Sequence, residues 1–115
     1  MKVVSYLDVE ARPVEAKGAI DVTKRVLISE DDGAKNFRMR CFEVGPGGAT
    51  PYHQHPWEHE AFILEGEGAC VDQGKAERPV GPGDAVFVPP NEWHSFVNKS
   101  ESTLRFLCLI PSQEV

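Results

Sequence analysis

Short apolar runs separated by turn residues occupy most of the chain. Residues 36–44, NFRMRCFEV, alternate large apolar and polar side chains with a period of two, which predicts a half-buried strand. Further strands are predicted over 23–29, over 59–64, and in the runs AVFVP, WHSFVN and TLRFLCLIP. The turn sequences between them are EDDGAK, GPGG (45–48), GEG (66–68), a hairpin-like turn at 72–74, GPGD, PPNE and NKSES. GPGG is expected to end the strand before it.

No window has the spacing of apolar side chains that predicts an amphipathic helix. Ten glycines and nine prolines leave little room for helices of three turns. Many short strands at this spacing indicate an all-β fold, either a sandwich or a barrel. At 115 residues the chain has the commonest length of a single domain. We expect residues 1–20 to form a short strand and an irregular arm that pack on a barrel of residues 21–115.

Three of the four histidines, His53, His55 and His59, fall within seven positions. Side chains two apart on a strand point to the same face, so His53 and His55 are predicted to look the same way from one strand. His59 opens the next strand, and a rolled-up sheet can bring the strand of His94 alongside. Taken singly, each is better explained as a surface loop residue or a hydrogen-bonded core histidine. Together they predict one site for a transition metal, because calcium and magnesium prefer oxygen ligands.

Two sequence motifs around these histidines resemble those of the cupin superfamily, G-x5-H-x-H-x3or4-E-x6-G and G-x5-P-x-G-x2-H-x3-N. The positions that fit the first motif are Gly47, His53, His55, residue 59 and Gly66, and those that fit the second are Gly83, Pro89, residue 91, His94 and Asn98. His59 replaces the usual glutamate, and Asn91 replaces a glycine. Asparagine tolerates a left-handed conformation, so the turn is expected to survive.

Glu60 is the alternative to His59 as the third residue of the first motif. It lies four residues after His55, but it leaves only five residues before Gly66. One step along a strand also moves the side chain to the opposite face. We therefore predict His59 as the ligand and expect Glu60 to point outward or to support a ligand.

HPWEHE, FRMR and FLCLIP resemble a subgroup of small single-domain cupins with four-histidine sites, in which manganese is a familiar occupant. This resemblance implies a double-stranded β-helix (jelly-roll) barrel that is commonly a homodimer. It also implies one divalent transition metal per chain held by His53, His55, His59 and His94. Manganese is the first expectation; iron, nickel, copper and zinc also suit imidazole ligands.

Four neutral imidazoles leave a divalent ion with its full charge, and an ion that prefers six ligands keeps two open positions. Open positions distinguish catalytic from structural sites. All four histidines are assigned as ligands, so no free imidazole remains as a general base. The expected function is a metal-dependent oxidoreductase, dioxygenase-like, acting on a small organic molecule. The alternatives are a non-catalytic module that binds a small molecule or a metal, and a metal-dependent isomerase or lyase.

A substrate pocket is predicted beside the metal. Alternation on the last strand places Cys108 on the same face as Phe106 and Ile110, and Arg40 is a candidate partner for a substrate carboxylate. The alternatives are a solvated outer face for Arg40 and plain core packing for Phe106 and Ile110. Trp57 and Trp93 wall the pocket mouth or pack at a subunit contact. The predicted pocket residues are Arg40, Phe96, Phe106, Cys108 and Ile110.

The formal net charge of −6 and the absence of a lysine or arginine run argue against nucleic acid and anionic membranes as partners. No apolar stretch is long enough for a signal peptide or a membrane span, so we expect a cytoplasmic protein whose partner is a small molecule. The three cysteines form no CxxC pair, and we expect them to be reduced, buried thiols.

Overall fold

Strands make up nearly all the regular secondary structure of the computed structural model, which describes residues 1–112. The strands are β1 (Arg12–Pro13), β2 (Ile20–Ile28), β3 (Phe37–Ala49), β4 (His59–Glu65), β5 (Gly68–Val71), β6 (Glu77–Val80), β7 (Ala85–Val88), β8 (Ser95–Val97) and β9 (Leu104–Pro111). Two 3-10 turns, η1 (Tyr6–Asp8) and η2 (Glu30–Asp32), are the helical elements of this region. The all-β prediction is confirmed.

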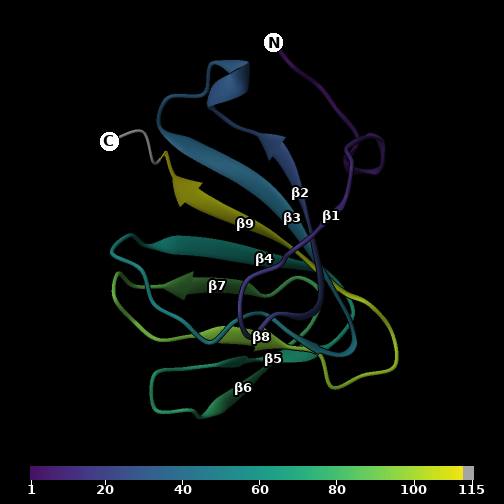
Figure 1. Cartoon of the computed structure of the whole chain (residues 1–115), viewed down its shortest axis with the longest axis vertical. Coiled ribbons are helices and arrows are strands. Elements are labelled where there is room, and N and C mark those ends of the chain that lie inside the picture. The colour runs from purple at the N-terminus through teal and green to yellow at the C-terminus, as the bar shows by residue number, and fades with distance from the viewer. Residues whose placement is uncertain (113–115) are drawn as a thin grey trace.

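The strands form one curled sheet in the order β6-β5-β8-β3-β9-β4-β7, in which β2 pairs with the other edge of β3 and β1 with β2. β2, β3, β9, β4 and β7 follow one another across one layer, and β8, β5 and β6 form the second (Figure 1). All the strand pairs are antiparallel. This curled antiparallel arrangement is that of a jelly-roll barrel.

β3 connects the two layers. Its first part, 37–44, pairs with β9, whereas Ala49 at its end pairs with Val97 of β8. The prediction that GPGG ends this strand is wrong, because pairing continues through these residues. Gly47 has a φ of 75°, and a Cβ at Gly48 would lie 2.5 Å from the carbonyl oxygen of Ile20. The glycines therefore bend the strand without ending it.

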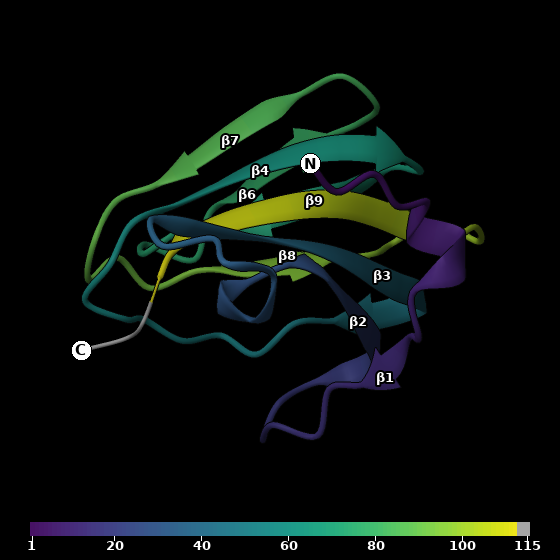
Figure 2. The same ribbon diagram turned by 90° about the horizontal axis from the view of Figure 1, so that it is seen from above.

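The N-terminal residues lie against the outer face of β2. β1 pairs with β2, and Arg25 of β2 donates hydrogen bonds to the carbonyl oxygens of Tyr6 (3.0 Å) and Val9 (2.7 Å). Figure 2 shows η1 and β1 along one side of the barrel. Residues 113–115 of the predicted barrel segment lie outside the described residues. Within 1–112, no helix has the length and apolarity needed to cross a membrane.

The core lies between the two layers, and β9 supplies its centre. Alternate residues of this strand are buried, with Phe106 only 1% exposed, as the alternating pattern predicts. Asn98 is also buried, and its amide nitrogen donates to the carbonyl oxygens of Val44 (2.9 Å) and Ser102 (2.7 Å). The amide therefore replaces strand pairing where the chain turns between β8 and β9.

Gly66→Ala is expected to destabilise the fold by about 1–3 kcal/mol more than Gly83→Ala. Both glycines have a left-handed φ, +81° and +91°, so the backbone strain of an alanine is shared. A Cβ at Gly66 would lie 2.1 Å from the carbonyl oxygen of Thr103, whereas nothing lies within 4 Å of one at Gly83. Urea denaturation of both variants measures the difference. Equal losses would show that β4 and the loop before β9 separate freely at this point.

Candidate metal centre

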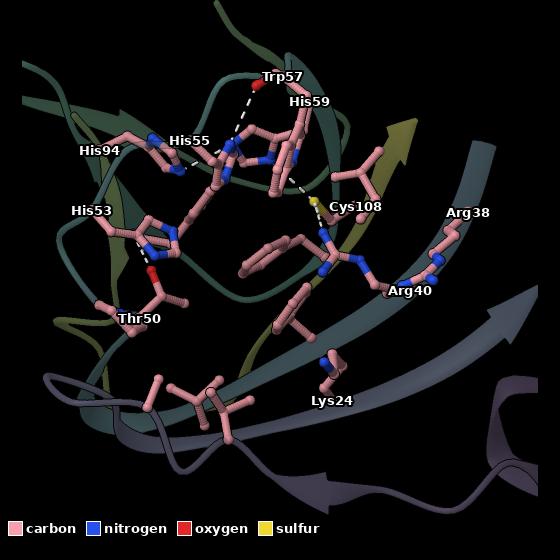
Figure 3. Close-up of a pocket in the computed structure, with 18 residues that line it drawn as sticks. Lys24, Arg38, Arg40, Thr50, His53, His55, Trp57, His59, His94 and Cys108 are labelled. Carbon is pink, nitrogen blue, oxygen red and sulfur yellow. Dashed lines mark hydrogen bonds between the residues drawn. The ribbon is translucent and has the colours of Figure 1, made fainter. Parts of the chain in front are cut away.

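A cavity of about 310 Å³ opens between the two layers (Figure 3). One wall is apolar and is built mainly from phenylalanine and aliphatic side chains of β2, β3, β8 and β9. The four histidines occupy one end. The lining residues with polar or aromatic heteroatoms are Lys24, Arg38, Arg40, Thr50, His53, His55, Trp57, His59, His94 and Cys108.

The backbone places the histidines on three segments. His53 and His94 exchange backbone hydrogen bonds in an isolated bridge, with N to O distances of 3.1 and 2.9 Å. The prediction that His53 and His55 share a strand is wrong. Pro51 and Pro56 flank the pair and lack the N–H groups that a ladder needs, so the segment extends without regular pairing. His59 is the first residue of β4.

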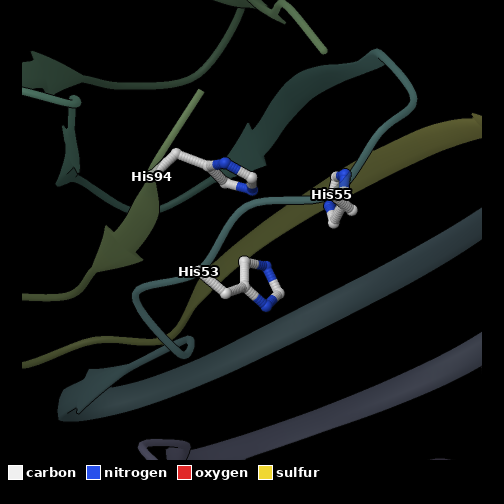
Figure 4. Close-up of side chains that lie close together, drawn as sticks. All are labelled: His53, His55 and His94. Carbon is white, nitrogen blue, oxygen red and sulfur yellow. The ribbon is translucent and has the colours of Figure 1, made fainter. Parts of the chain in front are cut away.

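The four imidazoles are neighbours, and the donor atoms of three of them form a compact group that does not include His59. Donor atoms of His53, His55 and His94 lie within 4.8 Å of one another (Figure 4). His59 joins them from β4: its ring centroid is 4.6 Å from that of His94 and 5.0 Å from that of His55. His59 and His94 are each only 5% exposed. The four histidines that the sequence predicts as one site are thus neighbours.

Hydrogen bonds to backbone carbonyls fix which nitrogen faces the cluster in the rings of His55 and His94. The Nδ1 of His55 lies 3.2 Å from the carbonyl oxygen of Trp57, and the Nδ1 of His94 lies 2.8 Å from that of Glu92. Carbonyl oxygens only accept, so Nδ1 carries the proton in both rings and Nε2 keeps its lone pair. The Nδ1 of His59 lies 3.1 Å from the Cys108 sulfur, which can accept in the same way.

The cluster fits a divalent ion. The Nε2 atoms of His59 and His94 are 3.0 Å apart. When the Cys108 sulfur accepts from Nδ1 of His59, the Nε2 lone pairs of His59 and His94 face each other, an arrangement that a cation would stabilise. Two nitrogens each about 2.1 Å from one ion, at right angles, are about 3.0 Å apart. The donor set and its spacing therefore suit one six-coordinate transition ion.

The protein holds these histidines neutral, as metal ligands must be. Burial, and then the neighbouring histidines, lower the pKa of His59 to about 3. Partial burial and the charge of His94 lower the pKa of His53, the most exposed of the four, to about 4. Burial is also the first cause that lowers the pKa of His55 and His94.

The metal-free protein is expected to lose stability as the pH falls from 7.5 to 5.5. In this range histidines of the unfolded chain, with a pKa near 6.5, become protonated, whereas those of the folded protein, with a lower pKa, stay neutral. Protonation therefore stabilises the unfolded state, and the free energy of unfolding decreases as the pH falls. The lowered carboxyl pKa values of Glu30 and Asp32 act only below this window. Melting temperatures of chelator-treated protein measure the effect. His59→Leu should show a weaker dependence on pH, and a melting temperature that rises on acidification would contradict the expectation.

The five predicted pocket residues all line the cavity. Arg40 points inward from β3, not to a solvated outer face, and its Nη2 lies 3.1 Å from the sulfur of Cys108. Phe96, Phe106 and Ile110 line the cavity and also belong to the buried core, so both interpretations of Phe106 and Ile110 hold.

The residues beside the ligands are mostly placed as predicted. Glu60 is exposed on the face of β4 opposite His59. Asn91 adopts a φ of 65°, which confirms the left-handed turn, and its N–H donates to the carbonyl oxygen of His55 (2.8 Å). Trp57 lines the cavity and stacks on His55 at 4.6 Å. Trp93 lies outside the cavity lining, is 40% exposed and stacks on Tyr52.

Lys24 is a cavity residue that the sequence analysis missed. It lies on β2 opposite Phe42 of β3 and shares a face with Val22. Strand 23–29 was predicted, and alternation along it defines two faces. The register that pairs β2 with β3 is what selects the inward face, and no local pattern carries that register.

A curled jelly roll with a histidine cluster at one end of its cavity defines a class of small β-barrels with a candidate metal site. Residues 40–110 match the Cupin domain family. The chain belongs to this cupin family.

The chain also aligns with individual cupins. It is 44% identical to the polyketide cyclase RemF from Streptomyces resistomycificus, with a TM-score of 0.93 over 98% of this chain and 80% of that one. It is 36% identical to 1-methylthio-D-xylulose 5-phosphate methylsulfurylase of Rhodospirillum rubrum over 80% of this chain, and 30% identical to gentisate 1,2 dioxygenase 1 of Aquipseudomonas alcaligenes over 75%. The chain spans only 57% and 27% of those two relatives.

Proposed function

We propose that this cupin is a metal-dependent enzyme that cyclises a small carbonyl compound of the polyketide type. The observation that carries the proposal is the grouping of four imidazoles at one end of a cavity that has an apolar wall. The 44% identity to a polyketide cyclase over 98% of the chain supports the choice of reaction. The dioxygenase-like chemistry expected from the sequence becomes the second candidate.

His53, His55, His59 and His94 would hold one divalent ion per chain. Manganese remains the first choice from the family resemblance, with iron, nickel, copper and zinc as alternatives that imidazole accepts. When bound, such an ion supplies Lewis acidity toward a carbonyl oxygen. Residues around the cluster hold the imidazole rings in place. Cys108 and the backbone carbonyls of Trp57 and Glu92 contact the Nδ1 atoms, as hydrogen-bond partners outside the ligand set do at metal sites.

The rest of the cavity would bind and orient the carbon chain. Its apolar wall excludes water, which strengthens polar interactions at the histidine end and protects a reactive intermediate from side reactions. Phe96 and Phe106 stack at 4.3 Å, and Phe42 continues the stack at 5.5 Å from Phe106. Such a rigid wall restricts the shapes that a flexible chain adopts, which brings its reacting carbons together.

A dioxygenase function is favoured by one specific relative. The chain is 30% identical to a gentisate dioxygenase over 75% of its length. The same open positions on the ion would then face dioxygen and an aromatic substrate, and the cavity residues would orient the ring.

Elemental analysis and two assays test these proposals. The protein should be purified without an affinity tag that binds metal, and about one transition metal per chain is expected. It is then given a linear poly-β-ketone, with cyclic product followed by mass spectrometry, and gentisate, with oxygen uptake followed by electrode. Cyclisation that chelator treatment abolishes supports the first function, and oxygen uptake supports the second. A loaded protein inactive in a broad panel of both substrate classes would indicate the non-catalytic binding module.

A further inference from the structure

Within residues 1–112, Arg40 differs from the other arginines in forming no ion pair with a carboxylate. Five arginines form ion pairs with aspartate or glutamate within 4 Å: Arg12 with Glu10, Arg25 with Glu43, Arg38 with Glu30, Arg78 with Asp72, and Arg105 with Glu43 and Glu65. Within residues 1–112, Arg40 contacts instead the thiol of Cys108 and the ring face of Phe42, 5.0 Å from the centroid. A partly buried guanidinium without an anion is an incomplete pair.

The cavity around Arg40 is cationic although the protein is acidic. The formal net charge of the chain is −6, yet none of the described residues that line the cavity is an aspartate or a glutamate. Lys24 lines it beside Arg40, and so does Arg38, whose guanidinium is paired with the carboxylate of Glu30. Burial first, and then the neighbouring charges of Arg40 and Arg38, lower the pKa of Lys24. An anion in this cavity would offset these positive charges.

Two buried nitrogen donors without hydrogen-bond partners also favour an anion in the cavity. Among the described residues, two side-chain nitrogens are buried without a hydrogen-bond partner, Nε of Arg40 and Nε1 of Trp57. Both belong to residues that line this cavity, and both are donors with no acceptor. Native proteins rarely leave buried donors unpaired. Neither nitrogen finds an acceptor among the described residues, and Nε belongs to the same guanidinium that a carboxylate in the cavity would contact.

We propose that Arg40, assisted by Lys24, binds the carboxylate of a small organic acid whose apolar body lies against the phenylalanine wall. The guanidinium presents a fixed fork that matches the two oxygens of a carboxylate. The occupant is thus defined by an anionic head and an apolar, planar body. This proposal rests on the proposed function in placing the reacting part of that acid toward the histidines, but carboxylate binding itself does not depend on turnover.

The position of Arg40 sets how a bound acid is oriented. The Cys108 sulfur lies 3.1 Å from Nη2 of Arg40 and 3.1 Å from Nδ1 of His59. One thiol therefore separates the anion-binding group from the histidine cluster. An acid held at Arg40 therefore lies close to the histidines, so a ligand of one or two rings can contact both the guanidinium and the histidine cluster.

Calorimetry with benzoate and benzamide tests this inference, because the two probes share a shape and differ in charge. The metal-loaded full chain is expected to bind benzoate at least 10-fold more tightly than benzamide. Arg40→Gln should lose most of that preference while its metal content stays unchanged. Arg78→Gln, in which a mostly exposed arginine outside the cavity lining is altered, is the matched control and should behave as the wild type. Arg40→Lys keeps the charge without the fork and should fall between.

Several outcomes would overturn the proposal. Equal binding of the two probes, no binding of benzoate, or a full preference retained by Arg40→Gln would each do so; the last would place the carboxylate at the metal instead. If Arg40→Gln does not fold, the preference for benzoate is measured in Arg40→Lys and Lys24→Gln instead, and both are expected to show a weaker preference than the wild type. A wild-type protein that contains its metal and turns over substrate, but does not prefer benzoate to benzamide, would contradict this inference and leave the proposed function intact. The opposite result is a protein that binds no metal but prefers benzoate through Arg40. It would contradict the proposed function and leave this inference intact.

Discussion

Replacing His59 by alanine is expected to weaken metal binding by at least about 100-fold and to remove activity. Losing a hydrogen-bonded group outside the ligand set of a metal already costs about 10–100-fold in affinity, and a direct ligand should cost more. The pKa of His59 is lowered further than that of His53, to about 3 against about 4. The Nε2 of His59 lies 3.0 Å from the Nε2 of His94. Elemental analysis after dialysis and competition with a coloured chelator measure the loss.

Glu60→Gln is the matched control for His59. It alters the adjacent residue of β4, which is exposed on the opposite face and is the other candidate for the motif glutamate. Its metal affinity is expected to stay within about twofold of the wild type, since the side chain faces solvent. If Glu60→Gln loses the metal and His59→Ala keeps it, the assignment of His59 as a ligand is wrong.

Replacing Phe106 by alanine is expected to lower the free energy of unfolding by about 3–5 kcal/mol. The ring is 1% exposed and lies between Phe42 and Phe96, at centroid distances of 5.5 and 4.3 Å. Its removal leaves a void in the core between the two layers of the sheet. Urea denaturation followed by tryptophan fluorescence measures the change.

Phe87→Ala provides the comparison for this core substitution. Phe87 lies on β7 and is 56% exposed, so the same truncation removes little buried surface. We expect a loss within about 0.5 kcal/mol, as for most surface substitutions. Similar losses for both variants would mean that Phe106 is not at the centre of the core, or that a partner covers Phe87.

The sequence predicted best what depends on alternation within one strand. The opposite faces of His59 and Glu60 on β4, and the inward set of β9, follow from the two-residue period alone. Asn91 was also predicted correctly, because few non-glycine residues adopt a left-handed turn. The clustering of four histidines followed from their spacing, while their role as metal ligands remains a prediction.

The failures concern partners that a local pattern does not contain. Whether GPGG ends a strand or bends it depends on β8 and on Ile20, which approach Gly48 from elsewhere in the chain. The sequence of the segment with His53 and His55 predicts a strand, but within residues 1–112 this segment makes a single isolated bridge, between His53 and His94. The inward position of Lys24 depends on the register between β2 and β3. Contacts between distant segments decided all three.

The distribution of the histidines along the chain bears on how folding and metal uptake are coupled. His53, His55 and His59 occupy seven consecutive positions, so they stay close together even when the chain is unfolded, whereas His94 is 35 residues away from His59. Under the proposed assignment, an ion also binds the unfolded chain through the local trio. Excess metal then raises the melting temperature by less than its affinity for the folded protein would give. The ion favours the closed barrel chiefly through His94, which reaches the trio only when the segment before β8 pairs with His53.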